Sequence, residues 1–257
     1  MCGRYTMFAK PSDVQQRFRA TMSAEVERKL STPRYNIAPT QEVPIITSRE
    51  YGRTVEIARW GLIPSWSRDA SLAYKLINAR AETLHEKPSF KDAFRKRRCL
   101  VVANGFYEWK NLSDHTSTLL SHPPPKKQPI YVQLKGGGLF GMAGLWEEWN
   151  NPATGDVVTT CTIITTQPNE LIATVHHRMA VVLTPEGEDV WLHQHESLES
   201  LRNLLKPLPS EVFEMYPVST RVNAINADDA SMIEPIALSE LAASAACASS
   251  KQRSLFS

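Results

Sequence analysis

Short apolar runs bounded by turn residues dominate the chain and predict a protein built mainly from β-strands. We expect strands at residues 43–47, 54–60, 99–103, 106–109, 129–134, 139–146, 161–166 and 180–183. The polar pair Tyr51-Gly52 predicts a turn between the first two of these strands. Asn104-Gly105, between residues 99–103 and 106–109, is a frequent turn sequence and predicts a β-hairpin there.

Helical periodicity occurs in only a few segments. In residues 11–30 the capping pair Ser12-Asp13 precedes apolar residues at helical spacing, which predicts one amphipathic helix that ends before Pro33. Shorter helices are expected around Phe90–Phe94 and at residues 169–175 and 196–205. Many strands with few intervening helices predict the α+β class, with mainly antiparallel pairing and a sheet that curls toward a barrel flanked by helices.

Two polar segments interrupt this pattern. Residues 111–128 include three consecutive prolines, and we expect a surface insertion. From residue 238 the chain turns to alanine, serine and scattered charge, and we expect residues 238–257 to form a disordered tail. Residues 1–237 are expected to fold as a single domain. No internal repeat is visible.

Composition narrows the class of protein. The 257 residues are 42% hydrophobic, enough for one sizeable core. The net charge of +2 neither demands nor excludes nucleic acid, and the run Arg95–Arg98 fits either a solvated face or contacts to phosphates. Four cysteines without a CxxC spacing argue against a disulfide framework or a zinc site and favour a reducing compartment. Without a secretory signal or a membrane-length apolar run, we expect a cytoplasmic protein that needs no metal or cofactor.

The second residue carries distinctive chemistry. Cys2 follows the initiator methionine and is small enough to allow removal of Met1. The mature chain would then begin with an α-amine and a thiol on adjacent carbons. Their reference pKa values, about 7.7–8.0 and about 8.5, leave a usable fraction of each nucleophile near neutral pH. Such a 1,2-aminothiol captures an aldehyde as a Schiff base and closes it to a thiazolidine. A frayed terminus with an incidental cysteine is the alternative.

Three further polar residues stand in apolar surroundings. Asn78 lies in LINARAE, Glu108 between Tyr107 and Trp109, and His176 directly after Val175. Taken singly, each also fits a structural role. Asn78 fits a turn cap, Glu108 an outward position on a strand, and His176 a histidine of the core or the surface.

Taken together, these residues belong to a series of motifs that resembles a known family. In chain order the motifs are MCGRY, RYNIAPTQ, WGLIPSW, LINARAET, RCLVVANGFYEW, GLWE, IITT and HHRMAVVL. They resemble the SRAP family, the SOS response-associated peptidase-like proteins, from Cys2 to about Asn223. Two positions depart from the family pattern. Asn104 stands where the family usually has aspartate, and Ala180 stands where it usually has proline.

The resemblance implies a SRAP-type fold and a protein of the DNA damage and SOS responses. It implies that Cys2 forms a covalent thiazolidine crosslink with the ring-opened sugar of an abasic site in single-stranded DNA, which shields the lesion. The resemblance also implies autoproteolytic removal of Met1 and lyase activity at abasic sites. We expect a monomer that acts alone on DNA and, in a bacterium, associates with the nucleoid.

The chemistry of capture suggests a role for each residue type. His176 suits the proton shuttle that opens the sugar ring, and Glu108 suits the acid that expels water from the Schiff-base precursor. Asn78 suits a non-titrating group that orients the amine or a sugar hydroxyl. For binding DNA, the candidates are the phosphate contacts Arg4 and Arg80, the stacking residue Trp66, and Asn36 and Pro39 in the loop that matches the family's DNA-facing loop.

Two other functions remain open at this point. An N-terminal-nucleophile amidohydrolase would also need a mature Cys2, but would turn over amides in a substrate pocket with an oxyanion hole. A non-covalent binder of single-stranded DNA would need the arginines and aromatic residues and would not need Cys2.

Overall fold

The computed structural model describes residues 2–112 and 127–236. Most of the predicted insertion and all of the predicted tail lie outside these ranges. Asn111 and Lys127, at the two ends of the insertion, pair with each other as the last residue of strand β8 (Gly105–Asn111) and the first of β9 (Lys127–Leu134). In the described part, the fold is α+β with mainly antiparallel pairing, as predicted.

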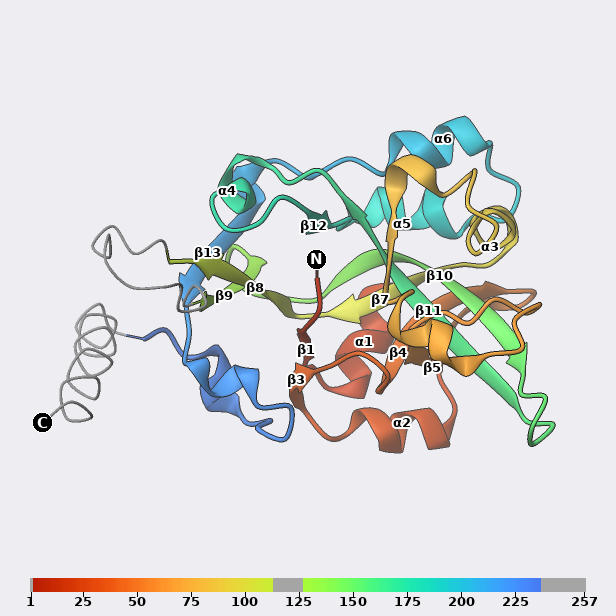
Figure 1. Ribbon diagram of the computed structural model, residues 1–257, viewed down its shortest axis with the longest axis horizontal. Helices are drawn as coiled ribbons and strands as arrows, with labels where there is room; N and C mark the ends of the chain where they lie inside the picture. The colour runs from red at the N-terminus through yellow and green to blue at the C-terminus, as the bar shows by residue number, and fades with distance from the viewer. Residues whose placement is uncertain (1, 113–126, 237–257) are drawn as a thin grey trace, which may run out of the picture.

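Five long strands close into a barrel (Figure 1). They are β4 (Glu42–Arg49), β5 (Gly52–Trp60), β7 (Arg98–Ala103), β10 (Phe140–Asn150) and β11 (Val157–Thr166). Antiparallel ladders join them in the order β5–β4–β7–β10–β11. The ring closes where β11 pairs in parallel with β5, at Thr160 with Arg59 and Cys161 with Trp60. The short strands β2 (Ala20–Thr21), β6 (Asn78–Arg80) and β12 (Met179–Ala180) add to this sheet.

A second sheet of five strands lies beside the barrel, in the order β13–β9–β8–β1–β3. Its remaining strands are β1 (Tyr5–Met7), β3 (Arg34–Ile37) and β13 (Phe213–Pro217). Strand β1 follows the amino terminus directly and pairs with both β8 and β3. Residues next to the amino terminus are therefore held by a sheet instead of fraying.

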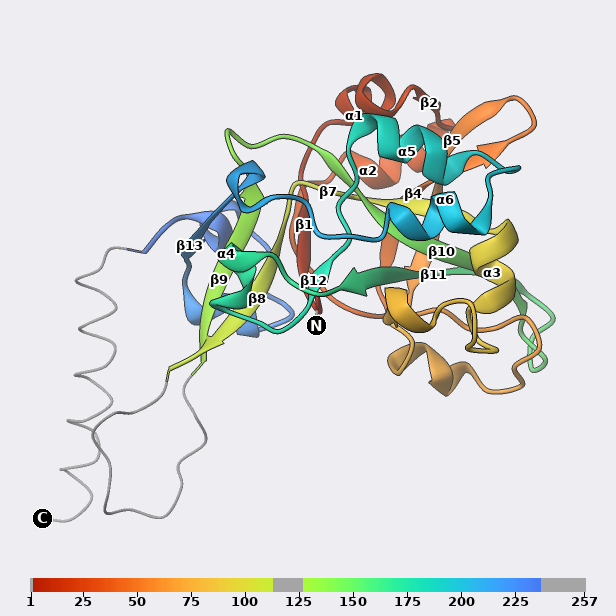
Figure 2. The same ribbon diagram turned by 90° about the horizontal axis from the view of Figure 1, so that it is seen from above.

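Six helices surround the strands in the described part of the chain. They are α1 (Pro11–Phe18), α2 (Ala24–Leu30), α3 (Lys91–Lys96), α4 (Glu170–Ala173), α5 (Pro185–Leu192) and α6 (Leu198–Asn203). Figure 2 shows α1 and α5 at the upper edge and the amino terminus at the lower edge, with β1 running between them. The face around the amino terminus is therefore opposite the face that α1 and α5 cover.

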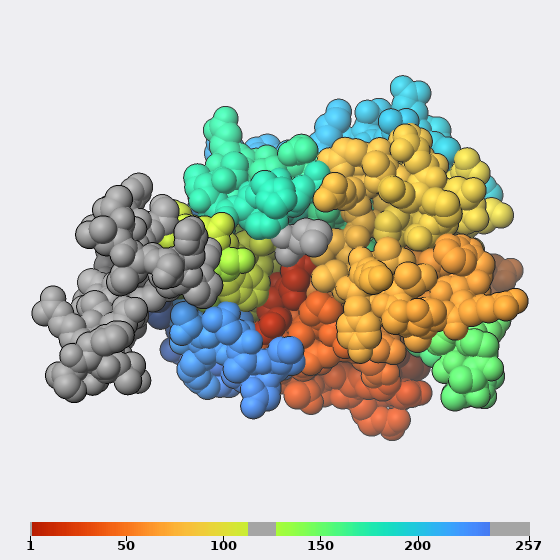
Figure 3. All heavy atoms as spheres, in the orientation of Figure 1, coloured from red at the N-terminus to blue at the C-terminus, as the bar shows by residue number. Residues whose placement is uncertain are grey.

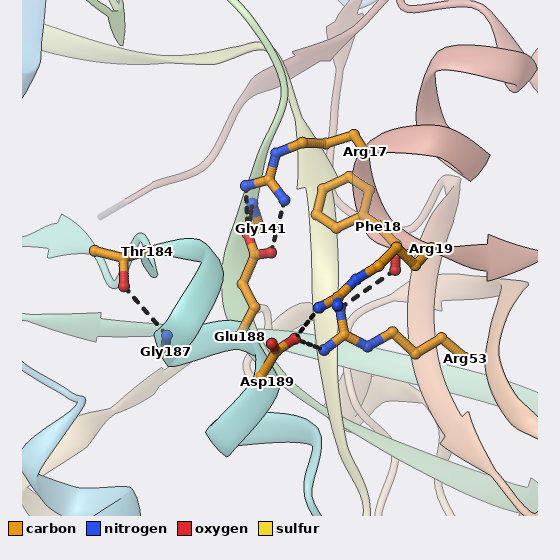
Figure 4. A network of polar contacts seen from close by, with 9 residues as sticks. All are labelled: Arg17, Phe18, Arg19, Arg53, Gly141, Thr184, Gly187, Glu188 and Asp189. Atoms are coloured by element: carbon orange, nitrogen blue, oxygen red, sulfur yellow. Dashed lines mark hydrogen bonds and ion pairs between the residues drawn. The ribbon is translucent and has the colours of Figure 1, made fainter.

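A network of charged side chains joins α1 and β5 to α5 (Figure 4). The buried carboxylate of Glu188 on α5 accepts hydrogen bonds from both terminal nitrogens of Arg17, at 2.8 and 2.9 Å, and from a backbone N–H of β10 at 3.1 Å. The neighbouring Asp189 pairs with Arg19 and Arg53. All of these charges have opposite partners within the protein, so we assign this network to the scaffold.

The single helix predicted for residues 11–30 is wrong. The chain leaves the helical conformation at Arg19, whose φ of 52° is left-handed, and Ala20–Thr21 then pair with β5 as β2. A second helix, α2, begins after Ser23, whose side chain accepts a hydrogen bond from the backbone N–H of Val26 at 3.3 Å. The apolar spacing across residues 11–30 therefore arose from two helices separated by a strand.

The hairpin predicted at Asn104-Gly105 is also wrong. Strand β7 belongs to the barrel and β8 to the second sheet, so the chain crosses between sheets at this point. A Cβ at residue 105 would lie 2.3 Å from the ring of Tyr131, so glycine is required by this close approach. The side-chain oxygen of Asn104 accepts a hydrogen bond from the backbone N–H of Phe8 at 2.8 Å. Aspartate would accept the same hydrogen bond, so either residue can fill this position.

Candidate active site at the amino terminus

Cys2 lies three residues before β1 and is fully buried. The side-chain nitrogen of Asn78 donates a hydrogen bond to the backbone carbonyl of Cys2 at 2.8 Å. Two residues on, the backbone carbonyl of Arg4 accepts from the N–H of Tyr107 on β8 at 2.9 Å. Figure 3 shows the residues nearest the amino terminus, in red, in the middle of one face of the molecule. The backbone from Cys2 to Arg4 is therefore held by β6 and β8.

The side-chain amide of Asn78 has a nitrogen that donates and an oxygen that accepts, and within the described residues only the nitrogen has a partner. Strand β6 is short but pairs in parallel with β11, Asn78 opposite Ile163, which fixes the position of the side chain. Its oxygen is buried and has no hydrogen-bond partner in the part of the chain that the structure describes. An unused buried acceptor costs free energy, which a donor arriving from a ligand or from a new terminal amine would recover.

The carboxyl group of Glu108 is the acid of the site. Glu108 is in β8 and is only 2% exposed. Burial raises its pKa to about 7, so near neutral pH it can both donate and accept a proton. Burial also raises the pKa of the Cys2 thiol, and the negative charge of Glu108 raises it further. With Met1 attached, the thiol is therefore neutral near pH 7.

His176 approaches Glu108 from the segment after α4. Its ring nitrogen Nδ1 lies 3.9 Å from Oε2 of Glu108. The backbone N–H of Arg178 points at the same Nδ1 at 3.0 Å, and in the tautomer that accepts this bond the ring proton is on Nε2. Burial lowers the pKa of His176, so the ring is neutral at neutral pH and available as a base.

A salt bridge that sequence reasoning missed supports this histidine. Arg178 donates two hydrogen bonds to the carboxylate of Glu82, at 2.6 and 2.9 Å, and a third to the carbonyl of Thr165 at 2.6 Å. The backbone of Arg178 in turn holds the ring of His176. Glu82 lies in the motif LINARAET and Arg178 in the motif HHRMAVVL. Their opposite charges were the only feature of the sequence that could have indicated this salt bridge.

The structure thus brings together the four residues Cys2, Asn78, Glu108 and His176, which come from separate parts of the chain. The family model of the SOS response associated peptidase (SRAP) matches residues 1–225. The chain belongs to the SRAP family. Among the described residues, no three His, Cys, Asp or Glu side chains are grouped to hold a metal ion, and no helix is long and apolar enough to span a membrane.

Several known proteins are similar to this chain over most of its length. The chain is 40% identical over 235 residues to the "Abasic site processing protein YoqW" of Bacillus subtilis, covering 91% of this chain and 99% of that one. It is 32% identical over 240 residues to the "Abasic site processing protein HMCES" of Gallus gallus, covering 85% of this chain and 71% of that one. A crystal structure of a Bacteroides thetaiotaomicron protein aligns with a TM-score of 0.80 at 30% identity, covering 92% of this chain and all of that one.

Of the candidates for DNA contact, Arg4 and Asn36 form one cluster. A terminal nitrogen of Arg4 donates to the side-chain oxygen of Asn36 and to the carbonyl of Val222, both at 2.7 Å. Asn36 is 1% exposed, and its amide nitrogen lies 2.6–3.2 Å from the carbonyl oxygens of Val222, Ala224 and Ala227. These contacts occupy the side chain of Asn36, so we interpret it as the group that positions Arg4 instead of a direct DNA contact.

The other three candidates lie nearer the surface. Trp66 is 60% exposed, and Arg80 is exposed at the end of β6, two residues after Asn78. Pro39 is partly exposed. The residue after it, Thr40, has a left-handed φ of 73° and donates its N–H to the carbonyl of Trp60 at 2.7 Å. This bond ties the loop of Pro39 to the end of β5.

Replacing Asn36 with alanine is expected to lower the free energy of unfolding by about 2–4 kcal/mol. The variant removes the Asn36 oxygen from the half-buried guanidinium of Arg4, which keeps its bond to the carbonyl of Val222. It also removes an amide donor shared by three backbone carbonyls. Urea unfolding followed by circular dichroism measures this loss. As a matched control, Asn203→Ala changes an exposed asparagine at the end of α6 and should leave the free energy within about 0.5 kcal/mol. Equal stability of the two variants would contradict the role given to Asn36.

Proposed function

We propose that this protein binds abasic sites in single-stranded DNA and captures them covalently as a thiazolidine through Cys2, after Met1 has been removed. The names of its SRAP relatives, abasic site processing proteins, support the class of lesion. The observation that carries the covalent step is the placement of Cys2 beside an acid with a pKa of about 7 and an amide that holds its backbone.

The first step is removal of Met1. With Met1 attached, the nitrogen of Cys2 is an amide and cannot attack an aldehyde. Hydrolysis of the peptide bond between Met1 and Cys2 consumes one water and releases the α-amine. We assign this cleavage to the protein itself or to an aminopeptidase, and intact mass of the purified protein measures whether it has occurred.

The amine is the first nucleophile, because the buried thiol is protonated. His176 in its neutral form takes the proton of the sugar's anomeric hydroxyl and passes it to the ring oxygen, which opens the ring to the aldehyde and leaves the histidine neutral again. The amine adds to the aldehyde carbon and forms a carbinolamine. Asn78, with its unused acceptor, orients the N–H groups of the amine.

Glu108 then acts twice. As an acid it gives its proton to the carbinolamine hydroxyl, so that water leaves and an iminium ion forms. The resulting carboxylate takes the proton of the Cys2 thiol, and the positive iminium nearby offsets the burial that otherwise keeps the thiol protonated. The thiolate adds to the iminium carbon and closes the five-membered ring. The carboxyl group ends in its starting form, and the product no longer carries the imine that would favour β-elimination.

The test is a crosslinking assay on a denaturing gel. Protein whose intact mass shows loss of Met1 is mixed with single-stranded DNA that contains one abasic site. We expect a heat-stable adduct, and none with a tetrahydrofuran analogue, which has the same shape but no aldehyde. If processed protein gives no heat-stable adduct with the abasic strand, covalent capture is wrong.

A further inference from the structure

Two large aromatic side chains are exposed in the loop between β5 and β6. Trp66 is 60% exposed and Tyr74 is 66% exposed. Figures 1 and 2 both show this loop, in orange, on the same face of the molecule as the amino terminus. The same loop leads directly into β6, which carries Asn78 and Arg80. Trp66 is already a candidate for stacking on a base of the DNA, whereas Tyr74 has no assigned role.

The exposure of Tyr74 is built into the fold of the loop. Tyr74 is the last residue of a 3₁₀ helix, η1 (Ala70–Tyr74), which Asp69 caps by accepting the N–H of Ser71 at 2.7 Å. The preceding residue, Ala73, is fully buried against Gly61, where a Cβ would lie 2.5 Å from the Ala73 carbonyl oxygen. Because Ala73 packs inward, its neighbour Tyr74 is held outward.

The segment around Trp66 is anchored in the same way. The indole N–H of Trp149, on β10, donates to the carbonyl of Ser67 at 2.6 Å, and the N–H of Leu62 donates to the carbonyl of Leu76 at 3.2 Å. Ile63, Ala73 and Trp149 form a small apolar cluster beneath the loop. Both aromatic rings are therefore presented on a fixed support, which lowers the entropy lost when a ligand stacks on them.

The charges of the loop select the kind of ligand. Arg68, Lys75 and Arg80 are exposed, whereas the single carboxylate in residues 61–80, Asp69, is used as the cap of η1. Exposed aromatic rings among cations are the combination that binds single-stranded nucleic acid, with stacking to the bases and attraction to the phosphates. A partner of this chemistry is the same strand that carries the lesion.

We infer that Tyr74 is a second base-stacking residue, which binds a nucleotide further along the strand on one side of the abasic site. This inference rests on the proposed function for the identity of the DNA, but it concerns non-covalent binding only. It predicts that the protein contacts the strand asymmetrically, over a longer stretch on the side of Tyr74. One stacked base contributes about 1–3 kcal/mol, which corresponds to a change in Kd of roughly 5- to 150-fold.

The test measures Kd by fluorescence anisotropy with a single strand that has a tetrahydrofuran analogue at its centre, so that no crosslink forms. Tyr74→Ala is expected to raise Kd by roughly 5-fold or more, whereas Tyr74→Phe keeps the ring and the affinity. The matched control is Tyr51→Ala. Tyr51 is 96% exposed in the turn between β4 and β5, which Figure 2 shows at the edge opposite the amino terminus. We expect Tyr51→Ala to leave Kd unchanged.

Whether the protein contacts the strand asymmetrically is tested by shortening the DNA from its 5′ end and, separately, from its 3′ end. On one side, shortening should weaken the wild type until it matches Tyr74→Ala, and on the other side it should weaken both proteins alike. Equal affinity of wild type and Tyr74→Ala at every length would overturn the inference. That result would mean that Tyr74 does not bind DNA, for example because it contacts a protein partner. Absence of any crosslink to the abasic strand would overturn the proposed function instead. The anisotropy measurement would still test whether Tyr74 contributes to binding DNA.

Discussion

Cys2→Ala is expected to lose the heat-stable adduct with abasic DNA, to below about 1% of the wild-type yield, because no other side chain can close the thiazolidine ring. The terminal amine remains after processing and can still form an imine, which borohydride reduction would trap. Affinity for the tetrahydrofuran strand should stay the same, because the arginines and aromatic residues are untouched. A denaturing gel with and without borohydride separates these products.

The matched control is Cys99→Ala. Cys99 is fully buried in β7, in the core of the barrel. The folded Cys99→Ala variant should crosslink like the wild type. Peptide mapping of the adduct by mass spectrometry should place the DNA on the peptide that begins with Cys2. Undiminished heat-stable adduct from Cys2→Ala would leave a non-covalent binder, or a different nucleophile, as the better description of this protein.

Glu108→Gln is expected to slow crosslinking by about 100-fold or more, since glutamine neither expels water from the carbinolamine nor takes the thiol proton. Because the wild-type carboxyl has a pKa of about 7 and must be protonated for the first of these tasks, the wild-type rate should fall above that pH. The variant should lack this fall. Single-turnover rates across pH 5–9 measure both effects. The control is Glu147→Gln, which alters a buried glutamate of β10 paired with Arg97 at 2.7 Å and should leave the rate unchanged.

The same variant should be more stable than the wild type at high pH. The pKa of Glu108 is about 7 in the folded chain against about 4.3 when unfolded, so between these values the folded state binds the extra proton. The free energy of unfolding of the wild type therefore falls as pH rises from about 4.3 to about 7, and it stays lower above that range. Glutamine does not titrate, so Glu108→Gln lacks this pH-dependent loss of stability.

Glu108→Gln should thus gain stability above about pH 7, by up to about 4 kcal/mol, and lose this advantage below about pH 4.3. Urea unfolding at pH 8 and pH 4 measures the difference. Parallel pH profiles of stability for wild type and Glu108→Gln would show that the carboxyl group is not held at a raised pKa, and the assignment of Glu108 as the acid would fall with it.

Three segments show how much of the fold follows from local sequence patterns. The apolar run at residues 99–103 is buried at every position as β7, because one face lines the barrel and the other packs against α3 and α5. The run Arg95–Arg98 was expected on a surface, yet Arg98 is 3% exposed and donates to the carbonyls of Phe94 and Trp191, among others. Helix α5 was not predicted, since its buried face includes the charged Glu188, whose partner is Arg17 far away in the chain.

The sequence by itself predicted the longer strands, the α+β class and the motifs that mark Cys2, Asn78, Glu108 and His176, because apolar periodicity and residue chemistry are local properties. It did not predict the shorter strands β1, β2, β3, β6 and β13, and of the strand expected at residues 180–183 only Ala180 belongs to one, β12. Only the tertiary structure decided that β11 pairs with β5 to close the barrel, that Asn104-Gly105 crosses between sheets, and that Asn36 holds Arg4. These features depend on contacts between residues far apart in the chain, such as Gly105 with Tyr131. The raised pKa of Glu108 has the same origin, since it comes from the burial that other segments impose on a strand residue.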